Sequence, residues 1–223
     1  MPSDVLPSNA KTGLESSITR LHATLATPLP FLKGVVVRSF LLERGAGNVL
    51  IYNSPGISAA ASDITDLGQP SRLLVNHWHE AMFEPPDLDV PIFVHQRDRA
   101  QTKLPIAGML SERECLGDDL EIIPTPGHTA GTTMFLWDNG EHRFLFPGDT
   151  IWVQGGEWKA VLLAEGDREA YLASLALVMS LSFAFLVPWG SEEGQPYAYS
   201  VSRIEAQDRL EQIVRRLRAG ENA

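Results

Sequence analysis

Residues 73–83 read LLVNHWHEAMF, an apolar run that ends in two histidines separated by one tryptophan. Continuous apolar runs of this length are typical of buried strands. In a strand, residues i and i+2 point to the same face, whereas in a helix they diverge by roughly 200°. We therefore expect a strand over 72–78, from whose end His77 and His79 converge while Trp78 points away. Converging imidazoles suit a metal ion, which needs a preset angle between its ligands. The alternative to a metal site is that one or both histidines only make hydrogen bonds within a packed loop.

Two later segments place a polar side chain in a glycine-containing turn after an apolar run. TPGHTAGTT (125–133) contains His128 after the run LEII, and FPGDT (146–150) contains Asp149 after the run RFLF. Taken alone, each segment is a weak indication of a site. An Asp in such a turn usually makes a hydrogen bond to the backbone, and a single loop histidine is more often hydrogen-bonded than a ligand.

The remaining pattern predicts one α/β domain over residues 31–223, preceded by a Pro-, Ser- and Thr-rich arm over residues 1–30. Two hairpins are expected over 35–53 and 132–149, with turns at 45–47 and 138–140. Further strands are expected at 90–95, 120–126 and 184–188. Helices are expected at 58–68, from Asp167 to Met179, and over 202–218, where Ser202 and Glu205 have the spacing of a capping box.

Composition restricts the classes of partner. The 223 residues carry a formal net charge of −10, which disfavours a nucleic-acid-binding surface. A single cysteine excludes an intrachain disulfide and a thiolate-rich zinc site. No segment resembles a signal peptide or reaches transmembrane length. We expect a cytoplasmic protein that acts on a small molecule, with no nucleic-acid or membrane partner, and the sequence predicts no oligomeric state.

In this order, the histidine pair, TPGHTAGTT and FLFPGDTIW resemble the metallo-β-lactamase superfamily, especially its glyoxalase II-like branch. The resemblance runs from about Val35 to about Gly194. It implies a mixed fold of the α/β (α+β) class, a four-layer αββα sandwich in which loops at one edge supply metal ligands. His77, His79, His128 and Asp149 match the ligands of the family's first metal site, Asp149 being the carboxylate that bridges to the second.

The chain departs from the family at the second metal site. The family's His-x-His-x-Asp-His motif has Ala81 and Met82 at its last two positions. The histidine of a later Pro-Gly-His-Gly turn is replaced by Gly190, and an Asp in an early segment is replaced by Tyr52. The resemblance therefore implies a degenerate site that holds one divalent ion, zinc or iron, or none.

Three functions are compatible with this pattern, so the sequence leaves open whether the protein is an enzyme. Three histidines with an open position suit zinc, as in a mononuclear hydrolase of a small ester or thioester. His77, His128 and Asp149 also match the two-histidine, one-carboxylate set of iron oxygenases, which the related persulfide dioxygenases use. The third possibility is a non-catalytic binding protein that descends from the fold.

Other residues near the vacated positions are candidates for roles in the site. A glutamate could replace the missing base, with solvated surface carboxylates as the alternative: Glu80, Glu84, Glu192 or Glu193. Large apolar side chains could line a pocket beside the ion, or could be ordinary packing residues. The principal candidates are Trp78, Met82, Trp152 and Trp189, and Phe83 and Trp158 are two further ones.

Overall fold

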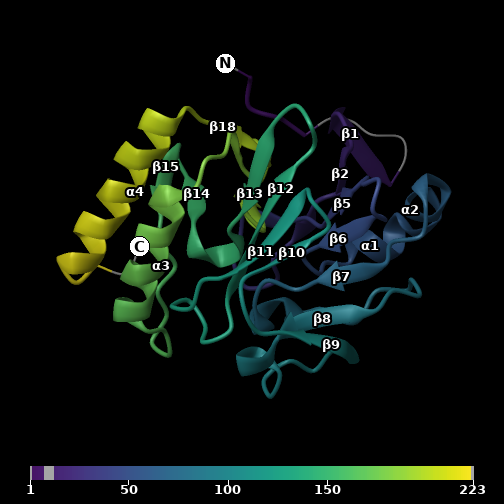
Figure 1. Ribbon diagram of the computed structural model, residues 1–223, viewed down its shortest axis with the longest axis horizontal. Coiled ribbons are helices and arrows are strands. Elements are labelled where there is room, and N and C mark those ends of the chain that lie inside the picture. Colours follow the sequence, from purple (N-terminus) through teal and green to yellow (C-terminus); the bar gives the residue numbers. More distant parts are fainter. Residues whose placement is uncertain (1, 8–12, 222–223) are drawn as a thin grey trace.

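The computed structural model describes residues 2–7 and 13–221. Two large β-sheets lie face to face, with helices on the two outer faces (Figure 1). The first sheet has the order β1-β2-β5-β6-β7-β8-β9, with the bounds Leu14–Ile18, Leu21–Thr24, Phe40–Leu42, Val49–Ile51, Arg72–Leu74, Ile92–His95 and Ile106–Leu110. The second has the order β10-β11-β12-β13-β16-β18, with the bounds Glu114–Leu116, Leu120–Pro124, Thr133–Asp138, Arg143–Phe146, Phe185–Leu186 and Tyr199–Ser200.

Two small sheets complete the strands. One is the hairpin of β14 (Trp152–Gln154) and β15 (Glu157–Lys159), and the other has the order β17-β4-β3. The bounds of that second small sheet are Gly190–Glu192, Val35–Val37 and Thr27–Pro28. The pairing of β17 with β4 places residue 190 beside Val37, so a segment late in the chain lies against an early one.

The alternation of side chains along the central strands explains the four layers. In β5, Phe40 and Leu42 enter the core between the two sheets, and Leu41 enters the core beneath the helices of the first sheet. In β12, Phe135 enters the central core and Leu136 enters the core beneath the helices of the second sheet. Successive side chains of a strand point to opposite faces, so strands that are apolar on both faces require a covering layer on each side.

The helices supply those covering layers. The short helices α1 (Gly56–Ala59) and α2 (Ala61–Leu67) pack on the first sheet through Ile57 and Ile64. The longer helices α3 (Arg168–Ser180) and α4 (Arg203–Arg218) pack on the second sheet, at the left of Figure 1. The mixed α+β, αββα sandwich expected from the resemblance is therefore confirmed.

Most of the expected elements form. The hairpin β12–β13 pairs antiparallel around residues 139–142, and β5 pairs antiparallel with β6. Asp167 caps α3 by accepting bonds from the backbone N–H groups of residues 169 and 170, and Ser202 and Glu205 form the expected capping box of α4. One expected strand divides, because β4 leaves the first sheet at Arg38 and joins the small sheet instead.

The expected N-terminal arm is corrected for residues 14–28. These residues form β1, β2 and β3, and β2 pairs with β5 through Leu21 and Ala23. Leu14, Leu21 and Ala23 are buried, so this segment supplies the edge of the first sheet rather than a loose extension. Residues 8–12, which the same expectation covers, lie outside the described part of the chain. Within the described ranges, the helices are too short or too polar to cross a membrane.

The Tyr52 side chain links loops that follow strands of both sheets. Tyr52 follows β6, is fully buried, and has a φ of +65°, which is unusual for a residue other than glycine. Its hydroxyl donates to the Val187 carbonyl at 2.9 Å and accepts from the Gly148 N–H at 2.8 Å. Burial raises the pKa of this phenol further above its ordinary value, so the hydroxyl keeps its proton.

We predict that Tyr52→Phe lowers the free energy of unfolding by about 1–3 kcal/mol, because it leaves the buried Gly148 N–H without a partner. Urea denaturation would measure the change. The matched control is Tyr199→Phe, since the half-buried Tyr199 hydroxyl makes no hydrogen bond within the described residues. Equal stabilities of wild type and Tyr52→Phe would contradict this role of Tyr52.

Candidate metal centre

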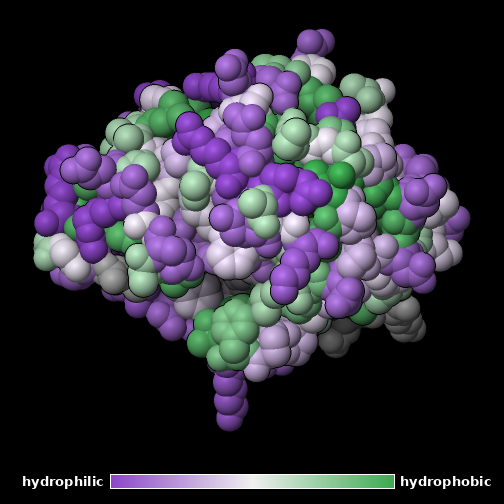
Figure 2. All heavy atoms as spheres, turned by 90° about the horizontal axis from the view of Figure 1, so that it is seen from below, coloured by the Kyte–Doolittle hydropathy of each residue, from purple (hydrophilic) through white to green (hydrophobic). Residues whose placement is uncertain are grey.

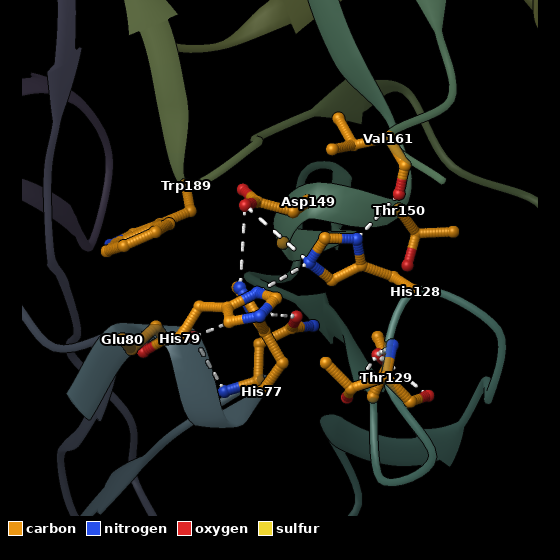
Figure 3. Close-up of polar contacts among 12 residues, drawn as sticks. His77, His79, Glu80, His128, Thr129, Asp149, Thr150, Val161 and Trp189 are labelled. Atoms are coloured by element: carbon orange, nitrogen blue, oxygen red, sulfur yellow. Dashed lines mark hydrogen bonds and ion pairs between the residues drawn. The ribbon is translucent and has the colours of Figure 1, made fainter. Parts of the chain in front are cut away.

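The four residues singled out in the sequence lie together where strands of both sheets end (Figure 3). His77 follows β7, and His79 lies in the short 3-10 helix at Trp78–Met82. His128 lies in the loop between β11 and β12, and Asp149 lies in the turn Gly148–Thr150 after β13. Because β11 and β13 run in the same direction, their C-terminal ends reach the same edge of the second sheet.

The expected reason for the convergence of His77 and His79 is wrong. Strand β7 ends at Leu74, and the chain turns at Trp78 into the 3-10 helix that contains His79. The two rings still meet, with centroids 5.0 Å apart, because this turn brings His79 back over His77. Trp78 does not point away from the site, since its ring lies 4.0 Å from that of His79. The loop conformation, rather than strand alternation, produces the pair.

The ligating atoms form a compact group. One atom from each of the four side chains can be chosen so that all lie within 4.8 Å of one another. His79 Nδ1 is 2.9 Å from His128 Nε2, and Asp149 Oδ2 is 3.4 Å from His77 Nε2 and 3.8 Å from His128 Nε2. Bond lengths of about 2.0–2.1 Å to a tetrahedral zinc ion place its ligands roughly 3.3 Å apart, so the group is compatible with one ion.

Backbone and amide acceptors outside the group orient two of the imidazoles. His77 Nδ1 lies 2.9 Å from Asn76 Oδ1, and His128 Nδ1 lies 2.6 Å from the Val161 carbonyl oxygen. Each acceptor requires the proton on Nδ1, and when the ring is neutral this tautomer leaves the Nε2 lone pair directed into the group. Outer acceptors of this kind are the usual partners of metal-ligating histidines.

The Nε2 atom of His77 carries the strongest indication of a ligand. It is completely buried and has no hydrogen-bond partner among the described residues. Buried polar atoms are nearly always satisfied, and an orphaned one requires an explanation. The atom faces Asp149 Oδ2, with the rings of His79 and His128 on either side. A divalent ion among these side chains satisfies Nε2, so the donor set fits a metal.

The four side chains strongly perturb one another's titration. Burial alone lowers the pKa of His77, but the carboxylates of Asp149 and Glu80 raise it to about 10. Burial, followed by the neighbouring His77 and His128, lowers the pKa of His79 to about 4. Burial and His77 also lower the pKa of His128. These shifts favour a positive charge on His77 beside Asp149, in the place that a cation would fill when bound.

Glu80 is neither a surface carboxylate nor positioned as a base. Its side chain is fully buried and accepts the backbone N–H groups of Asn53 at 2.6 Å and Asn76 at 2.8 Å, one on each oxygen. Burial raises its pKa, while these bonds and His77 oppose the shift. Glu80 therefore fixes the loop after β6 to the loop after β7, and this corrects both sequence-based interpretations.

The other three glutamate candidates lie away from the histidines. Glu192 accepts the Gly155 N–H at 2.8 Å, Glu193 is exposed in the following turn, and Glu84 is exposed beyond the 3-10 helix. A different carboxylate, that of Glu165, lies beside the group, with its Oε1 3.6 Å from His79 Nε2. No sequence pattern marks Glu165, because it precedes α3 and stands alone in a loop.

Asp98 is the second residue that sequence reasoning missed. It is buried and holds both histidine loops: its Oδ2 accepts from the Trp78 N–H at 3.0 Å and from the Thr129 hydroxyl at 2.6 Å. Its Oδ1 accepts from the Gly131 N–H at 2.7 Å. Among the charged residues of QRDRA, only spatial proximity distinguishes this aspartate, so no sequence pattern could have identified it.

A cavity of about 690 Å³ opens beside His79, His128 and Asp149. The four principal pocket candidates all line it: Trp78, Met82, Trp152 and Trp189. The two further candidates do not. Phe83 packs against the central core, and Trp158 is buried in the core beneath α3 and α4. The volume is in the range of small-molecule sites.

Comparison with known families agrees with this arrangement. The family model of the metallo-beta-lactamase superfamily matches residues 63–190, which is more than half of the chain. The chain belongs to the metallo-beta-lactamase superfamily. The match includes His77, His79, His128 and Asp149, so the grouped side chains lie within the region that defines the family. No curated protein matches this chain.

Solved structures of this superfamily share the fold over almost the whole chain. A metallo-beta-lactamase from Pontibacter korlensis has 16% identity and a TM-score of 0.66, covering 92% of this chain and 98% of its own. The structure of VMB-1 has 13% identity and a TM-score of 0.71, covering 98% of this chain and 99% of its own. A metallo-beta-lactamase family protein from Thermus thermophilus has 17% identity and a TM-score of 0.62, with 91% and 80% covered. At these identities the similarity is one of fold.

We predict that Asp98→Ala lowers zinc affinity by about 10–100-fold, because it releases the backbone on which His79 and His128 are held. Competition with a chromophoric zinc chelator would measure the affinity. The matched control is Asp89→Ala, since the exposed Asp89 carboxylate makes no hydrogen bond or ion pair within the described residues. Equal zinc affinities for Asp98→Ala and the control would show that the two loops hold their positions without Asp98.

Proposed function

We propose that this member of the superfamily binds one divalent metal ion and hydrolyses a small ester or thioester. The observation that carries the proposal is the buried Nε2 of His77, which makes no hydrogen bond within the described residues and faces Asp149 Oδ2 at 3.4 Å, beside two further imidazoles. The resemblance of TPGHTAGTT and FLFPGDTIW to the glyoxalase II-like branch supports a thioester or ester as the substrate. The acidic net charge supports a small-molecule substrate over nucleic acid.

A single ion is favoured by the residues at the vacated positions. Ala81, Met82 and Gly190 all line the cavity beside the histidines, and none of them offers a strong ligand for zinc. The nearby Glu80 does not replace the missing aspartate, since its side chain is fully buried outside the cavity lining and accepts a backbone N–H group on each oxygen. His77, His79, His128 and Asp149 are thus the residues that would hold the ion.

The bound ion would supply Lewis acidity, which polarises a carbonyl and lowers the pKa of water. The chain's own residues position the reaction. Asn76 and Val161 accept the Nδ1 protons of His77 and His128, so that Nε2 of each neutral ring is the nitrogen directed toward the group. Trp152 and Trp189 place apolar rings on the cavity side of the group. Hydrolysis adds water to the carbonyl carbon and breaks its C–O or C–S bond, which yields a carboxylic acid and an alcohol or thiol.

Iron chemistry of the persulfide dioxygenase type is a second candidate. Asp149 Oδ2 approaches Nε2 of both His77 and His128, which forms the two-histidine, one-carboxylate set of non-haem iron sites. Metal analysis of protein purified without added metal separates the candidates. Zinc near one equivalent supports the hydrolase, iron near one equivalent supports the oxygenase, and the absence of both supports a non-catalytic binding protein.

We predict that dialysed wild type retains one equivalent of metal, and that Ala81→Asp, Met82→His and Gly190→His together raise the content toward two. Residue 190 has room for a side chain, because a Cβ there meets its nearest neighbour, Val35 Cγ1, at 3.7 Å. Elemental analysis of both proteins after dialysis against zinc would test this. Two equivalents in the wild type would contradict the one-ion proposal.

We also predict that zinc-loaded wild type hydrolyses a glutathione thioester slowly, and that the triple variant is faster. Loss of one stabiliser of developing charge typically costs about 10²–10³ in rate, and the wild type lacks both a second ion and the orienting aspartate. Steady-state kcat values of the two proteins make the comparison. The control is His77→Ala, which removes a ligand of the remaining ion and should abolish turnover. Wild-type turnover at ordinary enzymatic rates would contradict the prediction.

A further inference from the structure

The cavity wall beside the histidine group is apolar at three positions where the resembling family has metal ligands. Ala81, Met82 and Gly190 line the same cavity as His79 and Asp149. In the resemblance on which the proposed function rests, these three positions carry polar side chains. Here they leave open, apolar space directly beside the place where chemistry occurs, so a substrate group that lies there loses its water without gaining a polar contact.

The same apolar surface continues to the mouth of the cavity. Phe31 and Leu32, in the loop between β3 and β4, line it on one side, and Leu163 lines it on another. Of the nine large hydrophobic side chains exposed in the described part of the chain, four line this one cavity: Phe31, Leu32, Met82 and Leu163. Apolar surface concentrated at one opening marks a binding site, whereas scattered exposed residues do not.

On the face seen from below, hydrophobic residues reach the surface in patches among hydrophilic ones (Figure 2). Polar side chains are sparse in the cavity wall. Away from the histidines and Asp149, the polar aliphatic side chains that line it are those of Gln101 and Lys103. An uncharged, flexible and apolar group fits such a wall better than a peptide or a sugar, whose many polar atoms would be left without partners.

We propose that the substrate is an ester or thioester of an apolar straight-chain acyl group. Its carbonyl lies at the histidine group, and its chain extends past Met82 and residue 190 toward Phe31 and Leu32. This inference rests on the proposed function for the ester or thioester bond. The class of ligand follows from the cavity itself, because a volume of about 690 Å³ lined largely by hydrocarbon selects for chain length.

The test uses uncharged straight-chain 2-alkanones from hexanone to decanone, which keep the carbonyl and the chain but cannot be hydrolysed. Binding to the full-length protein as purified is followed by tryptophan fluorescence, since Trp78, Trp152 and Trp189 line the cavity. We expect Kd to fall about fourfold for each added methylene. A Kd that does not depend on chain length would overturn the proposal.

Met82→Asp places a carboxylate in the apolar wall and should weaken decanone binding by at least about tenfold. The matched control is Met109→Asp, because Met109 is also an exposed methionine, on β9, and does not line the cavity. If Met82→Asp fails to fold, Leu163→Asp makes the same test at another exposed position of the wall. Unchanged decanone binding by the folded variant would overturn the proposal.

Two further outcomes separate the inference from the proposed function. Thioester hydrolysis without alkanone binding overturns the acyl-chain inference and leaves the hydrolase standing. Alkanone binding with the expected chain-length dependence, but without hydrolysis of any acyl ester, supports the ligand class and overturns the hydrolase. A dimer in analytical ultracentrifugation that Met82→Asp dissociates would mean that a second copy of the chain covers the mouth, and would overturn the acyl-chain inference.

Discussion

The side chain of Asn76 joins the two sheets at the point where the site forms. Its Nδ2 donates to the Thr133 backbone carbonyl, and the Thr133 N–H donates back to the backbone carbonyl of Asn76 at 2.9 Å. Its Oδ1 lies 2.9 Å from His77 Nδ1 and sets the tautomer of that ring. A Cβ at residue 148 would lie 1.9 Å from the same oxygen, so only glycine fits there, with its φ of +58°. One buried side-chain amide thus connects the loop after β7 to β12 in the other sheet, orients His77, and packs against the turn that contains Asp149.

Two buried carboxylates extend this arrangement to the remaining loops. Glu80 accepts backbone N–H groups from the loops after β6 and β7, and Asp98 accepts from the loops that carry His79 and His128. Each bond satisfies a group that would otherwise be buried without a partner, so the loops cannot separate without a large cost. The histidines are therefore held before any ion binds, and a ligand would meet preorganised donors.

The site combines a complete group of donors with a cavity wall that offers none. The anchors of the histidine loops are complete, whereas the positions opposite them, Ala81, Met82 and Gly190, offer no ligating nitrogen or oxygen from their side chains. An apolar cavity of about 690 Å³ therefore lies against an intact group of donors. A ligand that binds there would meet the donors at one end and apolar surface beside them.

The sequence by itself determined the individual strands and hairpins, through its apolar runs and turn residues. The four layers and the four grouped residues followed from the resemblance of the histidine pair, TPGHTAGTT and FLFPGDTIW, in that order, to this superfamily. Only the tertiary structure decided how His77 and His79 converge, that Glu80 is buried, and that Asp98 and Glu165 lie beside the histidines. Strand alternation and helix capping depend on residues close in the chain, so they leave a regular spacing in the sequence. Contacts between loops distant in sequence leave none, because they depend on where two sheets meet.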